Sequence, residues 1–154
     1  MRINLDLVDE FQQHFGQQVA FEKARDFMFA YISQIRSALP LAAAKGLEIA
    51  KKTRTGIATA KERTQTLRDM WDYVNQCEDA GNLSVPQASI TRALTWLLRD
   101  ELGHGEEYIS EVLNWFLYFA NEFEDPSEIA EELVRKVFIS ELGNGNPRHS
   151  TAQG

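Results

Sequence analysis

The sequence has few of the residues that cross-link or interrupt a chain. Its 154 residues include four prolines, nine glycines and one cysteine, Cys77. One thiol cannot form a disulfide within the chain, and it cannot build a cysteine-rich zinc site. A fold that depends on no disulfide suits a reducing compartment, so we expect a cytoplasmic protein.

Long apolar runs are also missing. No stretch approaches the roughly 20 uninterrupted apolar residues that a membrane-spanning helix needs. The first residues carry Asp6, Asp9 and Glu10 where a secretory signal would need an apolar segment. The sequence therefore predicts neither a membrane span nor an exported precursor, and we expect no membrane partner.

Positive charge is scarce. There are 16 Lys and Arg residues against 23 Asp and Glu residues, which gives a net charge of -7. Nucleic acid phosphates and anionic lipids repel an acidic surface, so the net charge also leads us to expect no nucleic acid partner and no membrane partner. Apolar residues make up 44% of the chain, which is enough to build the core of a domain of this length.

Motifs of common enzymes are absent as well. The sequence has no Gly-x-Ser-x-Gly turn, and the Gly-rich stretch GNGNP at 143–147 precedes no helix that could hold a phosphate. Cys77 falls on an apolar helical stripe, which is more typical of a core side chain than of a nucleophile. We therefore expect no enzymatic activity and no cofactor.

What the sequence does have is helical periodicity along nearly its whole length. Apolar residues recur at intervals of three and four, which gathers them on one face of a helix. The segments with this pattern are 5–15, 18–38, 41–52, 57–77, 86–98, 109–123 and 126–142. We predict an all-α fold, a single-domain antiparallel bundle of six to seven helices over 1–142. The residues 143–154 are expected to form a flexible tail.

Helix-breaking and helix-capping residues set the expected helix bounds. Gly16 marks a stop, and Gly56 marks a break or kink, with an uninterrupted helix as the alternative. Ser84 with Pro86 and Gln87 has the pattern of a capping box. Asp125 begins the strongest start signal, DPSE at 125–128. The middle helices are expected to bury Leu41, Ala44, Leu47 and Ala50 in one, and Ile57, Ala60, Leu67, Trp71, Val74 and Cys77 in the next.

Ten residues between two of these helices, RDELGHGEEY at 99–108, surround one histidine with four carboxylates. Glu101 and His104 have the Glu-x-x-His spacing of ferritin-like di-metal bundles. However, Gly103 and Gly105 flank the histidine, and each weakens a helix by about 1 kcal/mol relative to Ala. A helix end, a turn and a new helix start explain the whole stretch without a metal.

Charge is distributed unevenly along the chain. Residues 45–68 carry seven bases against two acids, whereas residues 99–141 carry twelve acids against three bases. Solvated helix faces that partly neutralise each other would explain this pattern. The sharper interpretation is that the acidic third binds a basic protein, because an acidic patch speeds encounter with a cationic partner.

The segment 109–123 is the most aromatic of the predicted helices. Phe116, Phe119 and Phe123 fit a core stripe, while Trp115 and Tyr118 fall beside it. These two residues either cover the edge of a buried helix or form an exposed patch with Tyr108 and Glu111. Tyr and Trp rimmed by carboxylates have the composition of a binding hot spot.

The order of the helices resembles a known group. An Ala-rich helix, LAAAKGLEIAKK, precedes a helix that ends LRDMWDYVNQ, and a capped helix and an aromatic helix follow. Over residues 20–123 this order resembles the small acidic all-helical immunity proteins of bacterial polymorphic-toxin and contact-dependent inhibition systems. The resemblance implies a protein that binds and blocks one cognate toxin domain. Toxin domains that attack nucleic acid are often basic, which would suit the acidic third.

We therefore predict a non-enzymatic protein-binding domain, an immunity-type inhibitor that neutralises a cognate, basic toxin domain. No catalytic, cofactor or metal residue is assigned. The expected partner-binding residues are Asp100, Glu101, Glu106, Glu107, Tyr108, Glu111, Trp115 and Tyr118.

Three alternatives stay open. A metal-binding, ferritin-like bundle would bring Glu10 and His14 close to Glu101 and His104. A regulatory or scaffold protein would form a homodimer through its aromatic helix. A nucleic acid contact through residues 45–68 is the third, although that segment lacks interleaved aromatic residues.

Overall fold

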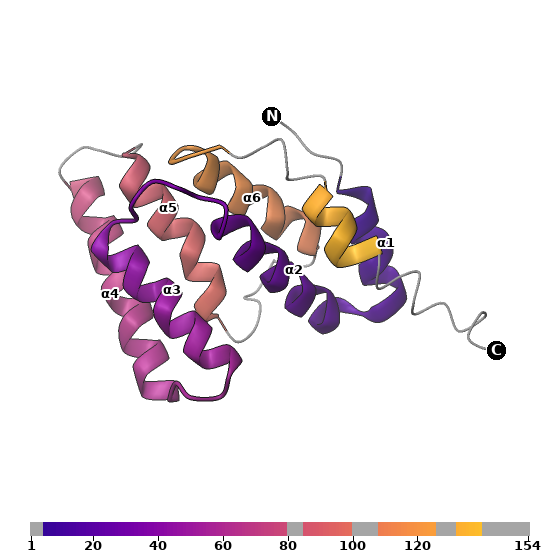
Figure 1. Ribbon diagram of the computed structural model, residues 1–154, viewed down its shortest axis with the longest axis horizontal. Helices are drawn as coiled ribbons and strands as arrows, with labels where there is room; N and C mark the ends of the chain where they lie inside the picture. The colour runs from indigo at the N-terminus through magenta and orange to yellow at the C-terminus, as the bar shows by residue number, and fades with distance from the viewer. Residues whose placement is uncertain (1–4, 80–84, 100–107, 126–131, 140–154) are drawn as a thin grey trace. The chain divides into compact units, whose positions relative to one another are not determined.

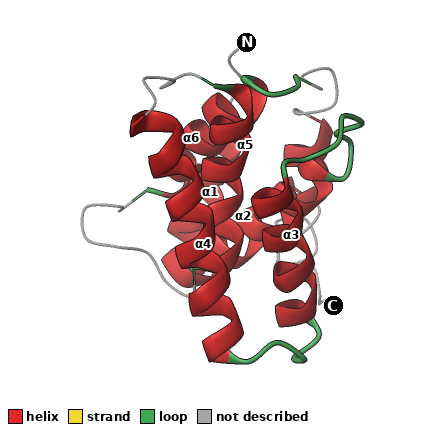
Figure 2. Ribbon diagram, turned by 90° about the vertical axis from the view of Figure 1, so that its left-hand side faces the viewer, coloured by secondary structure: helices red, strands yellow, loops and turns green. Residues whose placement is uncertain are grey.

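The computed structural model describes residues 5–79, 85–99, 108–125 and 132–139. Helices fill most of these ranges and no strand occurs in them, so the predicted all-α fold is confirmed (Figures 1 and 2). None of the described helices is long and apolar enough to cross a membrane. The elements are α1 (Asp6–Phe15), α2 (Gln17–Ile32), α3 (Leu41–Arg54), α4 (Ala60–Asp79), α5 (Pro86–Leu94), the 3-10 helix η1 (Thr95–Leu98), α6 (Ile109–Asn121) and the π-helical segment η2 (Arg135–Ile139).

The chain forms two compact units. Unit 1 combines residues 1–34, 103–113 and 126–154, and unit 2 combines residues 35–102 and 114–125. Unit 1 therefore contains α1, α2, η2 and the beginning of α6. Unit 2 contains α3, α4, α5, η1 and the remainder of α6. The expectation of one domain over 1–142 stays a prediction.

Unit 1 is organised around aromatic side chains and a capped helix start. Phe11 meets Phe138 edge to face, with ring centres 5.2 Å apart. The side-chain oxygen of Gln12 accepts a hydrogen bond from the N–H of Ile109 at 2.9 Å, so a first-turn N–H of α6 has a partner. The buried apolar residues are Leu5, Val8, Phe11, Ala20, Phe21, Ala24, Phe27, Met28, Tyr31, Ile32, Ile109, Val112, Leu113, Val134 and Phe138.

Unit 2 is built on the pair α3 and α4, which run side by side and are joined by the loop 55–59 (Figure 2). Helix α5 and η1 pack against both. The buried apolar residues of this unit are Ala43, Ile49, Ala50, Met70, Val74, Ala88, Ile90, Ala93, Leu94, Leu97, Leu98, Phe116, Leu117 and Ala120. The apolar stripes of neighbouring helices therefore share one core.

Helix α2 is shorter than predicted. It ends at Ile32 and not at residue 38. Beyond it, the N–H groups of Arg36 and Ser37 donate to the carboxylate of Glu124, at 2.9 and 3.0 Å. The Glu124 carboxylate thus accepts the hydrogen bonds that helix carbonyls would accept if α2 continued. Apolar periodicity does not predict such a distant partner.

Helix α3 buries a different face from the one predicted. Leu41 and Ala44 are exposed, and Leu41 retains 85% of its accessible surface. The buried residues of the helix are Ala43, Gly46, Ile49 and Ala50. Small side chains on this face let α4 approach closely, and the contact of Gly46 with Met70 is where the approach is tightest. Of the positions predicted to be buried, Ala50 is buried, whereas Leu41 and Ala44 are not.

The stripe of α4 and the start of α5 also differ in part from the prediction. Helix α4 buries Thr66, Met70 and Val74, while Trp71 is 38% exposed and does not belong to the core. The residue that precedes α5 is Val85 rather than Ser84, and Pro86 takes the first helical position as predicted. The residues 126–128 of the predicted start signal and the predicted tail at 143–154 lie outside the described residues.

Candidate functional site

Three helices of unit 2 bring aromatic side chains together around one arginine. Helix α4 supplies Trp71, α5 supplies Arg92, and α6 supplies Trp115, Tyr118 and Phe119. We call these five residues the aromatic cluster. The α6 residues lie three and four positions apart, which places their rings on one side of that helix.

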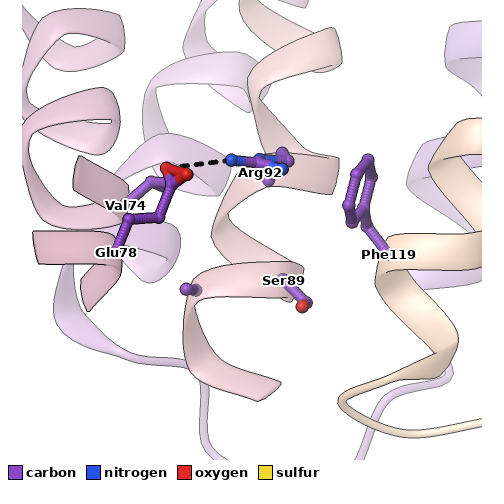
Figure 3. A pocket seen from close by; sticks show the side chains of 6 residues that line it. Val74, Glu78, Ser89, Arg92 and Phe119 are labelled. Atoms are coloured by element: carbon purple, nitrogen blue, oxygen red, sulfur yellow. Dashed lines mark hydrogen bonds and ion pairs between the residues drawn. The ribbon is translucent and has the colours of Figure 1, made fainter. Parts of the chain in front are cut away.

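Arg92 lies against two rings of the cluster. Its guanidinium carbon is 5.8 Å from the ring centre of Trp71 and 5.0 Å from the ring centre of Phe119. Its Nη2 atom is 3.1 Å from Oε2 of Glu78 on α4 (Figure 3). A planar guanidinium can face aromatic rings while its edge donates to a carboxylate. Arg92 therefore connects α4 and α6 from its position on α5.

The rings of α6 support one another. Trp115 stacks on Phe119 with ring centres 5.8 Å apart and an interplanar angle of 22°. Tyr118 meets Trp115 edge to face at 5.9 Å. Phe119 is half-buried, whereas Trp115 is 55% exposed and Tyr118 is 56% exposed. Two large aromatic side chains are thus held at the surface in defined orientations.

A small hollow lies beside Arg92 (Figure 3). Its volume is about 10 Å³, which is room for about one water molecule. Pockets for small-molecule ligands usually measure several hundred Å³. The hollow is therefore too small for a metabolite, and the aromatic cluster offers a contact surface instead. The lining residues are Val74, Glu78, Ala88, Ser89, Arg92 and Phe119.

Two carboxylates border the aromatic cluster. Glu78 pairs with Arg92, and Glu122 accepts a hydrogen bond from the buried hydroxyl of Ser89 at 2.5 Å. Glu78 is paired with a cation, whereas the hydrogen bond to Glu122 comes from a neutral hydroxyl, so Glu122 adds a negative charge near Ser89. This charge favours the approach of cationic groups to the cluster.

The predicted partner-binding residues have different outcomes. Asp100, Glu101, Glu106 and Glu107 lie outside the described residues. Tyr108 and Glu111 are exposed and belong to unit 1, whereas Trp115 and Tyr118 are exposed and belong to unit 2. The structure therefore brings Trp115 and Tyr118 together, in edge-to-face contact on α6.

Sequence reasoning missed three members of the aromatic cluster. Trp71 and Phe119 were assigned to the core, and Arg92 was not singled out. One signal was available, since Trp71 and Glu78 lie seven residues apart, which puts them on one side of a helix two turns apart. The contacts that complete the cluster join different helices, and no spacing along the chain encodes them.

The metal-binding alternative concerns titratable groups outside the cluster. The described residues contain no group of three or more His, Cys, Asp or Glu side chains that could hold a metal ion. Glu10 and His14 are exposed on α1, whereas a ferritin-like site would place them inside a bundle. Their expected companions, Glu101 and His104, lie outside the described residues.

Cys77 is half-buried near the end of α4. It lies one helical turn from Tyr73, and burial together with this neighbour raises the pKa of the Tyr73 hydroxyl above its usual 10.0. A hydroxyl with a raised pKa is deprotonated even less at neutral pH than an ordinary tyrosine, so Tyr73 supplies no phenolate to act on Cys77. This pair therefore does not change the interpretation of Cys77 as a packing residue.

Comparison with known proteins gives no family or fold relative: no family model, no curated protein and no solved structure matches this chain. The features of the chain that bear on its function are therefore the aromatic cluster and the pattern of charge.

Proposed function

We propose that this chain is a non-enzymatic protein-binding domain, and that the aromatic cluster is part of its contact surface. The observation that carries the proposal is the exposure of Trp115 and Tyr118, each more than half accessible on a helix whose other large apolar residues are mostly buried. Tryptophan, tyrosine and arginine are the residues that most often dominate the energy of protein interfaces. The cluster contains all three.

The support given by neighbouring rings makes these side chains suited to binding. An interface loses free energy when it immobilises flexible side chains. Trp115 is already stacked on Phe119, and Tyr118 already meets Trp115 edge to face. Such rings lose little freedom when a partner covers them, so more of the burial energy appears as affinity.

The chemistry beside the rings supports a basic partner. Aromatic faces attract cations, and Arg92 already lies against Trp71 and Phe119 in this way. The carboxylate of Glu122, which is bonded to the neutral hydroxyl of Ser89, adds to this preference. With the resemblance to acidic immunity proteins, these features support the specific proposal that the partner is a basic toxin domain, which the chain neutralises by covering its active surface.

A capture experiment with matched variants tests the proposal. Wild-type protein, the double variant Trp115→Ser/Tyr118→Ser and the control Leu41→Ser are used as bait in lysate of the source organism. Leu41 is also an exposed apolar residue of unit 2, but it lies outside the cluster. We expect one basic protein to be retained by wild type and by the control, and lost by the double variant.

Quantitative binding then follows with the purified partner. Loss of a hot-spot residue costs at least about 2 kcal/mol, so the double variant is expected to bind roughly thirtyfold more weakly or worse. One equivalent of wild-type protein should abolish the activity of the partner. If the double variant binds with the affinity of wild type, the cluster is not the contact surface. If a partner binds at the cluster without loss of its activity, the inhibitor role is wrong.

Self-association is a second candidate, because exposed Trp115 and Tyr118 could also meet their counterparts in another copy. Sedimentation velocity over a wide range of protein concentration separates the two. A homodimer that dissociates in the Trp115→Ser/Tyr118→Ser variant would favour the scaffold role. A wild-type monomer at every concentration would exclude it.

A further inference from the structure

The loop between α3 and α4 carries an exposed apolar residue at its apex. In Figures 1 and 2 this loop closes the lower end of the α3–α4 pair. Ile57 lies in the loop and is 69% exposed. It belongs to neither helix, and no role in the core explains it.

The backbone on the α3 side of the loop is closed by hydrogen bonds. Gly56 has φ +76°, the left-handed conformation that glycine adopts at low cost. The N–H of Ile57 bonds to the carbonyl of Lys52 at 2.9 Å, and the N–H of Gly56 bonds to the carbonyl of Thr53 at 3.0 Å. These two bonds form a Schellman motif at the end of α3.

The backbone on the α4 side is closed as well. The hydroxyl of Thr59 accepts a hydrogen bond from the N–H of Glu62 at 3.0 Å, and the Glu62 carboxylate accepts one from the N–H of Thr59 at 2.9 Å. This reciprocal pair is a capping box. Caps on both sides hold the five loop residues in a defined conformation.

These caps also explain why Ile57 is exposed. In a Schellman motif the residue at this position often packs against an apolar residue of the last helical turn. Here the position that it would contact is Lys52, whose side chain is itself largely exposed. The fold thus offers Ile57 no apolar neighbour at that position and leaves it at the surface.

Basic residues surround the apex. The last turn of α3 carries Lys51, Lys52 and Arg54, and the first turns of α4 carry Lys61 and Arg63. Between residues 51 and 63 the one acid is Glu62, and its carboxylate is engaged with Thr59. Just before this range, Glu48 lies 3.7 Å from Lys52. The end of the hairpin is therefore locally basic in a chain of net charge -7.

The charge close to the loop 55–59 determines which kind of partner this loop attracts. Charges more than about 8 Å apart are largely screened at physiological salt, so the acidic remainder does not cancel the hairpin. An apolar tip between basic residues matches the boundary of an anionic bilayer, where acyl chains lie below a layer of phosphates. A nucleic acid offers phosphates, but the range 51–63 has no aromatic side chain to stack on bases.

We infer that the loop 55–59 docks on the surface of a bilayer rich in anionic phospholipid, with Ile57 entering the acyl boundary and the flanking bases contacting lipid phosphates. Attachment of this kind is peripheral and needs no membrane-spanning helix. It departs from the expectation of no membrane partner, which was drawn from the net charge of the whole chain. It uses a different surface from the aromatic cluster, so either proposal can fail alone.

Co-sedimentation with vesicles tests the inference. The full chain is mixed with vesicles of phosphatidylcholine alone, and with vesicles that also contain about 30% phosphatidylserine. We expect binding to the anionic vesicles that falls at about 0.5 M salt. The variant Lys51→Gln/Lys52→Gln should bind on the order of tenfold more weakly, since each base near the surface contributes separately.

Two further variants separate the apolar contact from a general effect of surface change. Ile57→Ser should weaken binding to anionic vesicles, while Leu41→Ser should not. Leu41 is more exposed than Ile57, but it lies at the opposite end of α3, about 20 Å away for a helix of this length. Thermal unfolding of each variant, followed by circular dichroism, checks that the fold is kept.

Several results would overturn the inference. They are an absence of binding to anionic vesicles, equal binding to both vesicle types, and an Ile57→Ser variant that binds like wild type. A mobility-shift assay with an oligonucleotide duplex completes the test. Tighter binding to the duplex than to anionic vesicles would assign the basic hairpin to nucleic acid instead.

Discussion

Gly46 lies directly against the thioether of Met70, so that a β-carbon added at Gly46 would be 2.6 Å from the Met70 sulfur and 2.7 Å from its methyl carbon. Real β-carbons do not approach other atoms so closely. Met70 is completely buried, and it has little room to move away. The contact explains why α3 has a residue without a side chain at the position that faces Met70.

The effect of Gly46→Ala on the free energy of unfolding is expected to change sign when Met70 is replaced by alanine. In an open helix, Gly→Ala is stabilising by about 1 kcal/mol. Here overpacking costs about 1–3 kcal/mol, so Gly46→Ala should lower the free energy of unfolding. In a Met70→Ala background the same substitution should raise it. A double-mutant cycle by urea unfolding measures the coupling, and additive effects would contradict a direct contact.

The side chain of Gln12 is expected to contribute far more to stability than that of its neighbour Gln13. The side chain of Gln12 accepts a hydrogen bond from the N–H of Ile109, which is a fully buried residue. Gln12→Ala leaves this N–H without its partner and should cost about 1–3 kcal/mol of stability. Gln13 is exposed, so Gln13→Ala should change stability by less than about 0.5 kcal/mol. Urea unfolding of both variants checks this, and equal losses would speak against the capping role.

Glu124 is expected to make stability depend on pH in the acid range. The backbone N–H of Arg36 is the main cause that lowers the pKa of Glu124 below its ordinary 4.5, and the hydroxyl and N–H of Ser37 add to it. The folded state therefore favours the charged carboxylate. This contribution is fully present above pH 4.5, and it is lost as the pH falls through the lowered pKa of the folded state.

The matching measurement compares wild type with Glu124→Gln by urea unfolding between about pH 7 and pH 3. Wild type should be more stable at neutral pH, and its advantage should shrink as the pH falls below the ordinary glutamate value. Asp125→Asn removes a charge at the next position and serves as the control. A wild-type advantage that is unchanged down to the lowest pH would show that the carboxylate charge is not what binds Arg36 and Ser37.

Arg92 is expected to stabilise the fold more through its contacts with aromatic rings than through its ion pair with Glu78. Partly exposed ion pairs contribute up to about 1 kcal/mol, whereas each cation–π contact contributes about 0.5–1 kcal/mol and Arg92 makes two. Arg92→Ala should therefore destabilise by about 1–2 kcal/mol, and Glu78→Ala by less than half as much. Chemical unfolding compares the two losses. If Glu78→Ala lost more stability than Arg92→Ala, the ion pair would be the more important contact.

Sequence patterns predicted the helices better than their contacts. The stop at Gly16, the break at Gly56 and the start at Pro86 are local properties of the backbone, and the structure agrees with them. The buried face of α3 was wrong because periodicity favours large apolar residues. The chain instead buries Gly46, where a β-carbon would be 2.6 Å from the Met70 sulfur and Met70 would have to shift.

The candidate site was predicted only where its residues share one helix. Trp115 and Tyr118 are three residues apart, so their proximity was visible in the sequence. The place of Arg92 against Trp71 and Phe119 depends on how three helices pack, which no local pattern contains. The end of α2 was missed for the same reason, because Glu124 reaches Arg36 from 88 positions away.

The interleaving of the two units has a consequence for how the chain acquires its structure during synthesis. Unit 2 is complete once Asp125 has been made, whereas unit 1 also needs the helical residues 132–139. Helices α1 and α2 precede every element of unit 2 along the chain, yet Phe11 must wait for Phe138 before its core closes. As the chain leaves the ribosome, the unit that begins first is therefore finished last.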